Sequence, residues 1–294
     1  MSAAATPESH YDAERVTVIR PTRGWAALNL RELWDYRELL YFLIWRDVKI
    51  RYKQTAVGVL WIVLQPLLVA MLFTFIFGRY GHFPMQGMPY LLFAYSGMLP
   101  WLLFENGLTL STKSIVENQA LVTKVYVPRL LIPIAPVLGG VVDFAIGGCV
   151  LVVLIAIYDW RGLLPAGSLG WPLLTLPFFL LFCIVAAIAV TLWLSALNVK
   201  YRDVQYTVPF LARVWFFATP VVWPISLLAS SSYQRWLGLN PMTGVVEGFR
   251  WALFGSSVAE VGTIMLLSLG VTVVLLVGGV AYFRRVERSF ADVV

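Results

Sequence analysis

Apolar and charged positions change their pattern sharply within the first 78 residues. Over residues 29–53 charged and apolar residues alternate at helical spacing, and one face collects Leu33, Tyr36, Leu40, Leu43, Ile44 and Val48. Residues 54–78 then contain no charge, and this stretch exceeds the roughly 20 residues that cross a bilayer. The pattern predicts an amphipathic helix lying in the membrane surface over 29–53, followed by a first span over 56–78.

Five more apolar segments predict five further spans. With the first, the spans are expected at residues 56–78, 90–110, 131–157, 172–197, 204–224 and 262–283. Residues 225–261 are expected not to cross, because they begin with serines and contain Asn240-Pro241 and Arg250. Two short re-entrant helices between spans five and six, the second over 244–255, fit this segment better. The expected fold is an all-α membrane protein with six transmembrane helices and an N-terminal amphipathic interface helix.

The composition supports this fold class. Hydrophobic residues make up 60% of the 294 residues and charged residues 13%, which lies outside the usual range of soluble proteins. This argues against the alternative of a surface helix joined to a core helix in a soluble domain. The expected organisation is a flexible cytoplasmic tail (1–28), the interface helix (29–53), the transmembrane domain (54–283) and a cytoplasmic C-terminal tail (284–294).

The distribution of positive charge predicts the orientation. Under the six-span topology, 18 of the 22 Lys and Arg residues fall on one side of the membrane. The other side holds Arg79, Arg161, Arg235 and Arg250. Because short loops rich in Lys and Arg stay in the cytoplasm, both termini are expected there, in a multi-pass protein of the cell (inner) membrane.

Motifs for catalysis are missing from the sequence. It contains no Gly-x-x-x-x-Gly-Lys-Ser/Thr phosphate loop, no Gly-x-Ser-x-Gly and no His-Glu-x-x-His. Cys149 and Cys183 lie in apolar segments, and His10 and His82 are far apart. We expect no enzyme activity, metal or cofactor in this chain. Energy for any transport would then come from a partner or an ion gradient.

Two polar segments between spans are candidates for contacts with other molecules. Residues 111–124 have the pattern of a short amphipathic helix, which would dock into a groove of a soluble partner or rest on lipid headgroups. Residues 198–203 are either a positively charged anchor with a local Arg–Asp pair or a functional motif. The residues alone leave both pairs of alternatives open.

Several short motifs follow one another in a fixed order over residues 29–294. They are RYKQT (51–55) with Gly58 and WxxxQP (61–66), LVxKVYxPR (121–129), NVxYRDV (198–204), WFxATPV (215–221), LNPM (239–242) and ERxFADV (287–293). Together they resemble the membrane subunit of ABC transporters of the polysaccharide-export type, which export O-antigen, capsule and teichoic acid polymers. The chain departs from the family at Val57-Gly58, where Leu-Gly is usual, and at Glu105 and Arg213, where uncharged residues are expected.

The resemblance implies a homodimer that pairs with two copies of a nucleotide-binding ATPase subunit, which would hold ATP and Mg²⁺. The substrate would be a polysaccharide such as O-antigen, or its undecaprenyl-linked form, within membrane lipids, and no nucleic acid is expected as a partner. The implied ATPase-coupling residues are Arg46, Asp47, Lys113, Glu117, Asn118 and Lys124. The implied cytoplasmic gate and motif residues are Gly58, Tyr201, Arg202 and Asp203.

The implied channel would run along the dimer interface. Trp61, Gln65, Leu68, Leu72 and Phe75 share one helical face. Gln65 is costly against lipid, so this face is expected to meet protein or water. Aromatic rings offer flat surfaces on which sugars slide. The expected channel residues are Trp61, Gln65, Phe75, Arg213, Trp215, Phe216, Phe217 and Trp223. The alternative is that these aromatics pack against neighbouring helices or lipid.

Two of the ionisable residues inside predicted spans, Arg213 and Asp143, have candidate roles. Arg213 is expected either to meet the diphosphate of a lipid-linked polymer, helped by Lys49, Arg51 and Lys53, or to snorkel or pair with a nearby carboxylate. Asp143 is expected to be a structural hydrogen-bond acceptor rather than a proton carrier, because no second ionisable group shares its predicted depth.

Two other functions stay open at this point. One is an ABC exporter of a drug or small lipid with the same membrane fold. The other is a polytopic glycan-lipid transferase, which would need carboxylates or histidines clustered at one membrane face. The sequence shows no such cluster.

Overall fold

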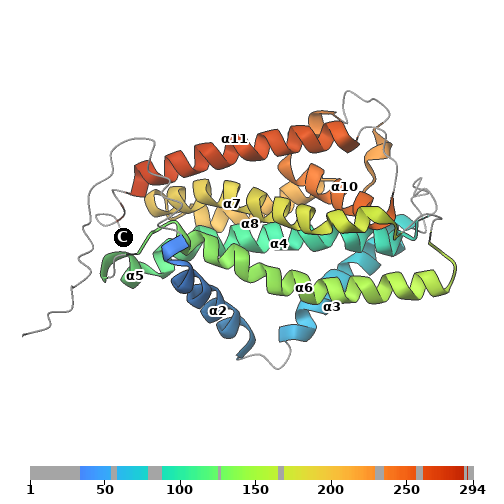
Figure 1. The fold of residues 1–294 in the computed structure, drawn as a ribbon, viewed down its shortest axis with the longest axis horizontal. Coiled ribbons are helices and arrows are strands. Elements are labelled where there is room, and N and C mark those ends of the chain that lie inside the picture. Colours follow the sequence, from blue (N-terminus) through green and yellow to red (C-terminus); the bar gives the residue numbers. More distant parts are fainter. Residues whose placement is uncertain are drawn as a thin grey trace, which may run out of the picture.

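The chain folds into a bundle of long helices. The computed structural model describes residues 34–53, 58–78, 88–124, 127–164, 169–228, 235–255, 261–287 and 290. The predicted tail over 1–28 and part of the predicted C-terminal tail lie outside these ranges. Figure 1 shows α4, α6, α7 and α11 running along the longest axis, with α2 and α3 inclined to them.

The described elements are almost all α-helices. In chain order they are α2 (Arg37–Lys53), α3 (Gly58–Phe73), the π-helix η2 (Thr74–Gly78), α4 (Tyr90–Glu117), α5 (Gln119–Lys124), α6 (Leu131–Trp160), the 3₁₀ turn η3 (Trp171–Thr175), α7 (Leu176–Lys200), α8 (Val204–Ala218), the 3₁₀ turn η4 (Ile225–Leu227), α10 (Pro241–Phe254) and α11 (Val261–Glu287). The described ranges contain no strand, so the all-helical class is confirmed there.

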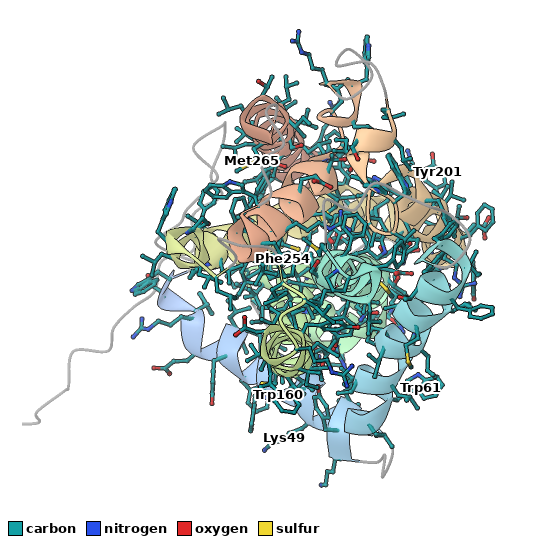
Figure 2. All side chains as sticks on the ribbon, turned by 90° about the vertical axis from the view of Figure 1, so that its right-hand side faces the viewer. Lys49, Trp61, Trp160, Tyr201, Phe254 and Met265 are labelled. Atoms are coloured by element: carbon teal, nitrogen blue, oxygen red, sulfur yellow. The ribbon has the colours of Figure 1, made fainter. Side chains whose placement is uncertain are left out.

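Helix α4 lies at the centre of the bundle. It contacts α3, α6, α7, α8 and α10, and Figure 2 shows it enclosed by other elements. Its small residues allow close approach: a Cβ on Gly107 would lie 3.3 Å from Val137. Several of its buried hydroxyls bond within the helix, as where Thr112 Oγ1 donates to the Leu108 carbonyl at 2.6 Å. A helix surrounded by protein tolerates such polar residues, which would be costly against lipid.

Four helical segments within the described ranges are long and apolar enough to cross a membrane: Leu60–Gly78, Leu131–Trp160, Trp171–Lys200 and Gly262–Glu287. They match the predicted first, third, fourth and sixth spans, so the protein is a multi-pass membrane protein. Helix α4 covers the predicted second span, although it is less apolar than these four. The count of six spans stays a prediction.

The predicted fifth span over 204–224 is wrong as a single helix. Helix α8 ends at Ala218, and turns follow as far as η4. Its 15 residues cover only about 22 Å at 1.5 Å per residue, less than the ~30 Å hydrocarbon core. Pro220 and Pro224 explain the end, because proline lacks the N–H that would continue the helical hydrogen bonds.

The predicted short helix over 111–124 is also divided differently. Helix α4 continues through these residues to Glu117, and α5 begins at Gln119. Asn118 separates the two helices, and its side-chain Nδ2 donates to the Ser114 carbonyl at 2.8 Å. Ile115 and Val122 are buried in one apolar cluster on the two sides of this break. Residues 111–117 therefore belong to the central helix of the bundle.

Helix α2 is apolar on two sides. Leu43 and Val48 are buried, and Leu43 packs with Leu131 and Ala135 at the start of α6. Two residues of the predicted apolar face therefore lie against the protein. Away from this contact, the exposed large residues on and just before α2 are Trp34, Tyr41, Phe42, Trp45 and Ile50. The placement of α2 in the membrane surface stays a prediction.

Helix α10 begins three residues before the predicted second re-entrant helix. Asn240 caps its N-terminus, with Oδ1 accepting from the Met242 N–H at 3.1 Å. The same Oδ1 accepts from Trp215 Nε1 of α8 at 3.0 Å, and Nδ2 donates to Thr219 Oγ1 at 2.8 Å. Gly255 ends the helix with φ 63°, a conformation that favours glycine. Both ends are therefore set by local sequence.

Close packing of α10 against α7 gives a test of this fold. A Cβ on Gly248 would collide with the Phe179 ring. Gly248→Ala should therefore lower the free energy of unfolding by about 1–3 kcal/mol, the usual cost of overpacking. Gly262→Ala is the matched control, since a Cβ there meets nothing within 4 Å. Thermal unfolding of the purified protein measures both, and equal melting temperatures would contradict the described packing.

Candidate functional site

The predicted channel face of the first span is exposed on this subunit. Trp61, Leu72 and Phe75 are 54%, 56% and 58% exposed, and Gln65 and Leu68 are exposed between them. On the other side of α3, Pro66 and Ala70 are buried. The face predicted from helical spacing is therefore turned away from the subunit's own bundle.

Helix α8 exposes a second aromatic stripe. Tyr206, Phe210 and Phe217 are 76%, 65% and 60% exposed, and Arg213 is exposed among them. The four residues follow one another at spacings of four, three and four, so they share one helical face. Tyr206 and Phe210 were missed by the sequence analysis, although this same spacing would have identified them.

The two stripes lie on neighbouring helices. Phe73 of α3 contacts Phe216 of α8, with ring centroids 6.4 Å apart, and both helices pack against α4. Figure 2 places Trp61 and Tyr201, which precedes α8, on the same side of the bundle. We call the exposed residues Trp61, Gln65, Phe75, Tyr206, Phe210, Arg213 and Phe217 the aromatic face.

Three of the residues expected to line a channel, Trp215, Phe216 and Trp223, contact neighbouring elements of this subunit. Trp215 packs edge-on against Phe104 of α4 at 5.1 Å, and Phe216 against Trp101 at 5.7 Å. Trp223 is half-buried and donates from Nε1 to the Phe217 carbonyl at 3.0 Å. Trp215 and Phe216 lie on the side of α8 that faces α4, whereas Trp223 follows the end of α8 at Ala218. Their place in a channel stays a prediction.

Arg213 lies within electrostatic range of a carboxylate of the bundle. Its positive charge interacts electrostatically with the half-buried Glu105 of α4. Glu105 Oε2 also accepts from Trp101 Nε1 at 3.0 Å. The two charged residues at which this chain departs from the family pattern therefore act on each other. The ion pairs between described residues do not join Arg213 to Glu105, and the Arg213 side chain is exposed on the aromatic face, so both alternatives for its role stay predictions.

A pocket of about 470 Å³ brings together four of the six predicted coupling residues. It lies between α2, the end of α4 and the start of α6, and its lining includes Arg46, Asp47, Glu117 and Asn118. Arg46 pairs with Asp47 at 2.8 Å. Lys113 pairs with Glu117 at 2.9 Å, and Lys124 is exposed on α5 outside the lining. We call this the α2–α4 pocket.

The end of α2 is attached to α6 by Asp143. This carboxylate forms an ion pair with Arg51 and accepts from the Tyr52 hydroxyl at 2.5 Å. Burial raises the pKa of the Tyr52 phenol, and the hydrogen bond to Asp143 raises it further, so the hydroxyl stays a donor. Asp143 is thus a structural acceptor, as predicted. The expectation that no ionisable group shares its depth was wrong, because Arg51 reaches it.

The turn between α7 and α8 is organised by Asn198 rather than by a local ion pair. Asn198 Oδ1 accepts from the Gln205 N–H at 3.0 Å in the first turn of α8. Arg202 and Asp203 are exposed, and the ion pairs between described residues do not join them. Gly58 lies on a different element, as the first residue of α3.

Other motifs of the sequence meet in space. Arg129 of the LVxKVYxPR motif donates to the Glu287 carbonyl and lies over the Phe290 ring of the ERxFADV motif at 5.9 Å. Asn240 of LNPM bonds with Trp215 and Thr219 of WFxATPV. These motif residues therefore join segments of the bundle that are distant in the sequence.

Arg250 has a role that the sequence analysis missed. It was assigned to the outer surface, but only 2% of its side chain is exposed. It pairs with Glu247 at 2.9 Å, donates to the carbonyls of Pro220 and Val221, and lies 3.6 Å from the centroid of the Phe93 ring. The spacing of Glu247 and Arg250, three residues apart in an apolar helix, was the available signal.

The fold and these sites define an α-helical membrane protein with several spans. Among the described residues no group of His, Cys, Asp or Glu could hold a metal ion. A family model described as ABC-2 type transporter matches residues 38–254, and the chain belongs to this family.

Similar proteins carry names from polysaccharide export. The chain is 30% identical over 265 residues to an O-antigen export system permease protein RfbA of Myxococcus xanthus, covering 90% of this chain and 98% of the relative. It is 28% identical to a protein of the same name from Klebsiella pneumoniae, covering 90% and 97%. It is 23% identical to the polysialic acid transport protein KpsM of Escherichia coli, covering 85% and 94%.

The buried Arg250 cluster gives a second prediction. Arg250→Met leaves the Glu247 carboxylate buried without its partner, and should destabilise the protein by about 3–5 kcal/mol. The double variant Glu247→Leu/Arg250→Met should recover part of this loss, because no unpaired charge remains. Arg161→Met, at an exposed arginine, is the control. Thermal unfolding in detergent measures all three, and an Arg250→Met protein as stable as the control would contradict the assignment.

Proposed function

We propose that this chain is the permease subunit of an ATP-driven exporter that moves a polysaccharide such as O-antigen, or its lipid-linked form, from the cytoplasm across the cell membrane. Support comes from membership of the ABC-2 transporter family and from relatives named for O-antigen export and polysialic acid transport. The observation that carries the proposal is the exposed aromatic face on α3 and α8.

The chemistry of the aromatic face suits a sugar polymer. Its rings present flat apolar surfaces to the C–H faces of sugars, while Gln65 and Arg213 supply hydrogen-bond donors for hydroxyl or phosphate groups. Contacts of this kind repeat along the face and do not define one deep site. A polymer can therefore advance by exchanging one ring for the next.

A second copy of the chain would complete the channel. Most of the span Leu60–Gly78 is left uncovered by the subunit itself, since only 11% of its most apolar window is buried. Gln65 on that span is costly against lipid, which favours a protein or water neighbour. In a homodimer with α3 and α8 at the interface, two aromatic faces would enclose the polymer.

The α2–α4 pocket is the proposed contact with the nucleotide-binding subunit. Its lining combines charges of both signs with Asn118, at the break between α4 and α5. Such a surface fits a polar element of a soluble protein better than it fits lipid. Two ATPase subunits, holding ATP and Mg²⁺, would dock there on the dimer, and this chain would perform no hydrolysis itself.

In the proposed topology the protein lies in the inner membrane of the cell, with both termini in the cytoplasm. Burial of Arg250 strengthens the charge asymmetry on which this rests, because it removes one of four cations from the opposite surface. The drug or small-lipid exporter shares the family fold but lacks support from the names of the relatives.

Truncating the aromatic face tests the export function. Trp61→Ala and Phe217→Ala should each reduce export roughly two- to tenfold, since an aromatic contact is worth about 0.5–1.5 kcal/mol. Trp160→Ala is the control, because Trp160 is 88% exposed but lies on α6. The measurement is surface polysaccharide and intracellular polymer in a deletion strain complemented with each variant at equal protein level. Normal export by both face variants would refute the proposed role.

Charge reversal in the α2–α4 pocket tests the docking site. Asp47→Lys should reduce co-purification of the ATPase subunit severalfold, because a like charge would face the neighbouring Arg46 and the partner. Glu38→Lys is the matched control, on the same helix but outside the pocket. If both variants retain the ATPase equally, α2 does not dock it through this pocket.

A further inference from the structure

We infer that a groove on the outside of the bundle, between α6 and α7, binds an acyl chain of a bilayer phospholipid. The groove has a volume of about 540 Å³. Its walls come from α6 and α7, and Leu99 of α4 with Phe249 and Leu253 of α10 close its inner side.

The groove has no charged residue in its lining. Its only polar side-chain atom is the thiol of Cys149, and the remaining residues are Leu, Phe, Ile, Val, Pro, Ala and Gly. Apolar cavities of this kind stay dry, because a water molecule needs two to four polar partners. An empty groove would also forfeit dispersion contacts along its walls. A flexible hydrocarbon chain supplies those contacts.

Adjacent glycines create the groove. On Gly147 a Cβ would lie 2.6 Å from Leu99, so this residue is needed for packing α6 against α4. On Gly148 a Cβ would meet nothing within 4 Å, and Gly148 lines the groove. Because α6 turns by about 100° per residue, one glycine brings the helices together while the next leaves space on the outer side.

The groove lies at the depth of the acyl chains of the bilayer. Trp160 and Trp171 are 88% and 71% exposed at the ends of α6 and η3, where aromatic residues mark the membrane interface. At 1.5 Å per residue, the α6 part of the lining, from Ile155 back to Phe144, lies about 8 to 24 Å below Trp160. Half of a ~30 Å hydrocarbon core is about 15 Å, so the lining starts among the acyl chains of this leaflet and continues past the bilayer midplane.

A second copy of the chain is not needed to cover this surface. The aromatic face of α3 and α8 is the proposed dimer contact, and Figure 2 shows Trp61 and Tyr201 on the right-hand side of the bundle and Trp160 in its lower half, away from that side. The groove is lined instead by α6, α7 and α10 with Leu99. It therefore opens to lipid, and the inference stands even if the exported substrate is not a polysaccharide.

Photo-crosslinking tests the groove directly. The full-length chain would be reconstituted into vesicles of phosphatidylethanolamine and phosphatidylglycerol that contain a phosphatidylethanolamine with a diazirine in one acyl chain. Adducts mapped by mass spectrometry should be severalfold denser on residues 144–155 than on the exposed face of α11. Equal density on both surfaces in the unaltered protein would overturn the inference.

Two glycine variants sharpen the test. Gly148→Phe fills the groove from its open side and should reduce the adducts there to the level on α11. Gly270→Phe is the matched control, because a Cβ at Gly270 also meets nothing within 4 Å but Gly270 lies on α11. Undiminished labelling in Gly148→Phe would overturn the inference. So would disulfide cross-linking of Cys149 between two copies, which would place a second subunit over the groove.

Discussion

Burial of the Arg250 guanidinium constrains how α4, α8 and α10 can be arranged. An ion removed from water has to receive hydrogen bonds to every N–H group and a counter-charge, or it destabilises the fold. Arg250 obtains these from Glu247 on its own helix, from Phe93 on α4 and from the carbonyls of Pro220 and Val221 beyond α8. The two carbonyls are available because α8 ends at Ala218 and leaves the next residues non-helical. One side chain therefore requires the end of α8, the start of α4 and the body of α10 to meet at one place.

The Asp143 carboxylate in α6 obeys the same constraint. It forms an ion pair with Arg51 and accepts a hydrogen bond from Tyr52, and these two interactions fix α2 to a membrane span. The α2–α4 pocket lies beside this attachment. A partner that pushes on the pocket would therefore act on α6 through Asp143, as well as on α4 through Glu117 and Asn118. The polar residues that look isolated in the sequence are the ones that join helices.

Sequence reasoning succeeded where a property depends on local pattern. The spans formed by α6, α7 and α11 were predicted because each is a long apolar run. The spacing of Trp61, Gln65 and Phe75 likewise predicted that they share one face of α3. It failed where the outcome depends on packing between distant segments. Trp215 and Phe216 share α8 with Phe217, but only tertiary structure decides which of them turn toward α4. Arg250 was placed on the surface because a charge count contains no information about Glu247 and the carbonyls that surround it.

Asn240 has a consequence for motion. Both ends of its amide are committed, with Oδ1 shared by Trp215 and Met242 and Nδ2 bound to Thr219. Within hydrocarbon no water replaces these bonds, so separating α8 from the start of α10 would leave several polar atoms unsatisfied at once. Because Arg250 also binds α10 and the residues after α8 to Phe93 of α4, the end of α8, the start of α4 and α10 should move as one body during a transport cycle.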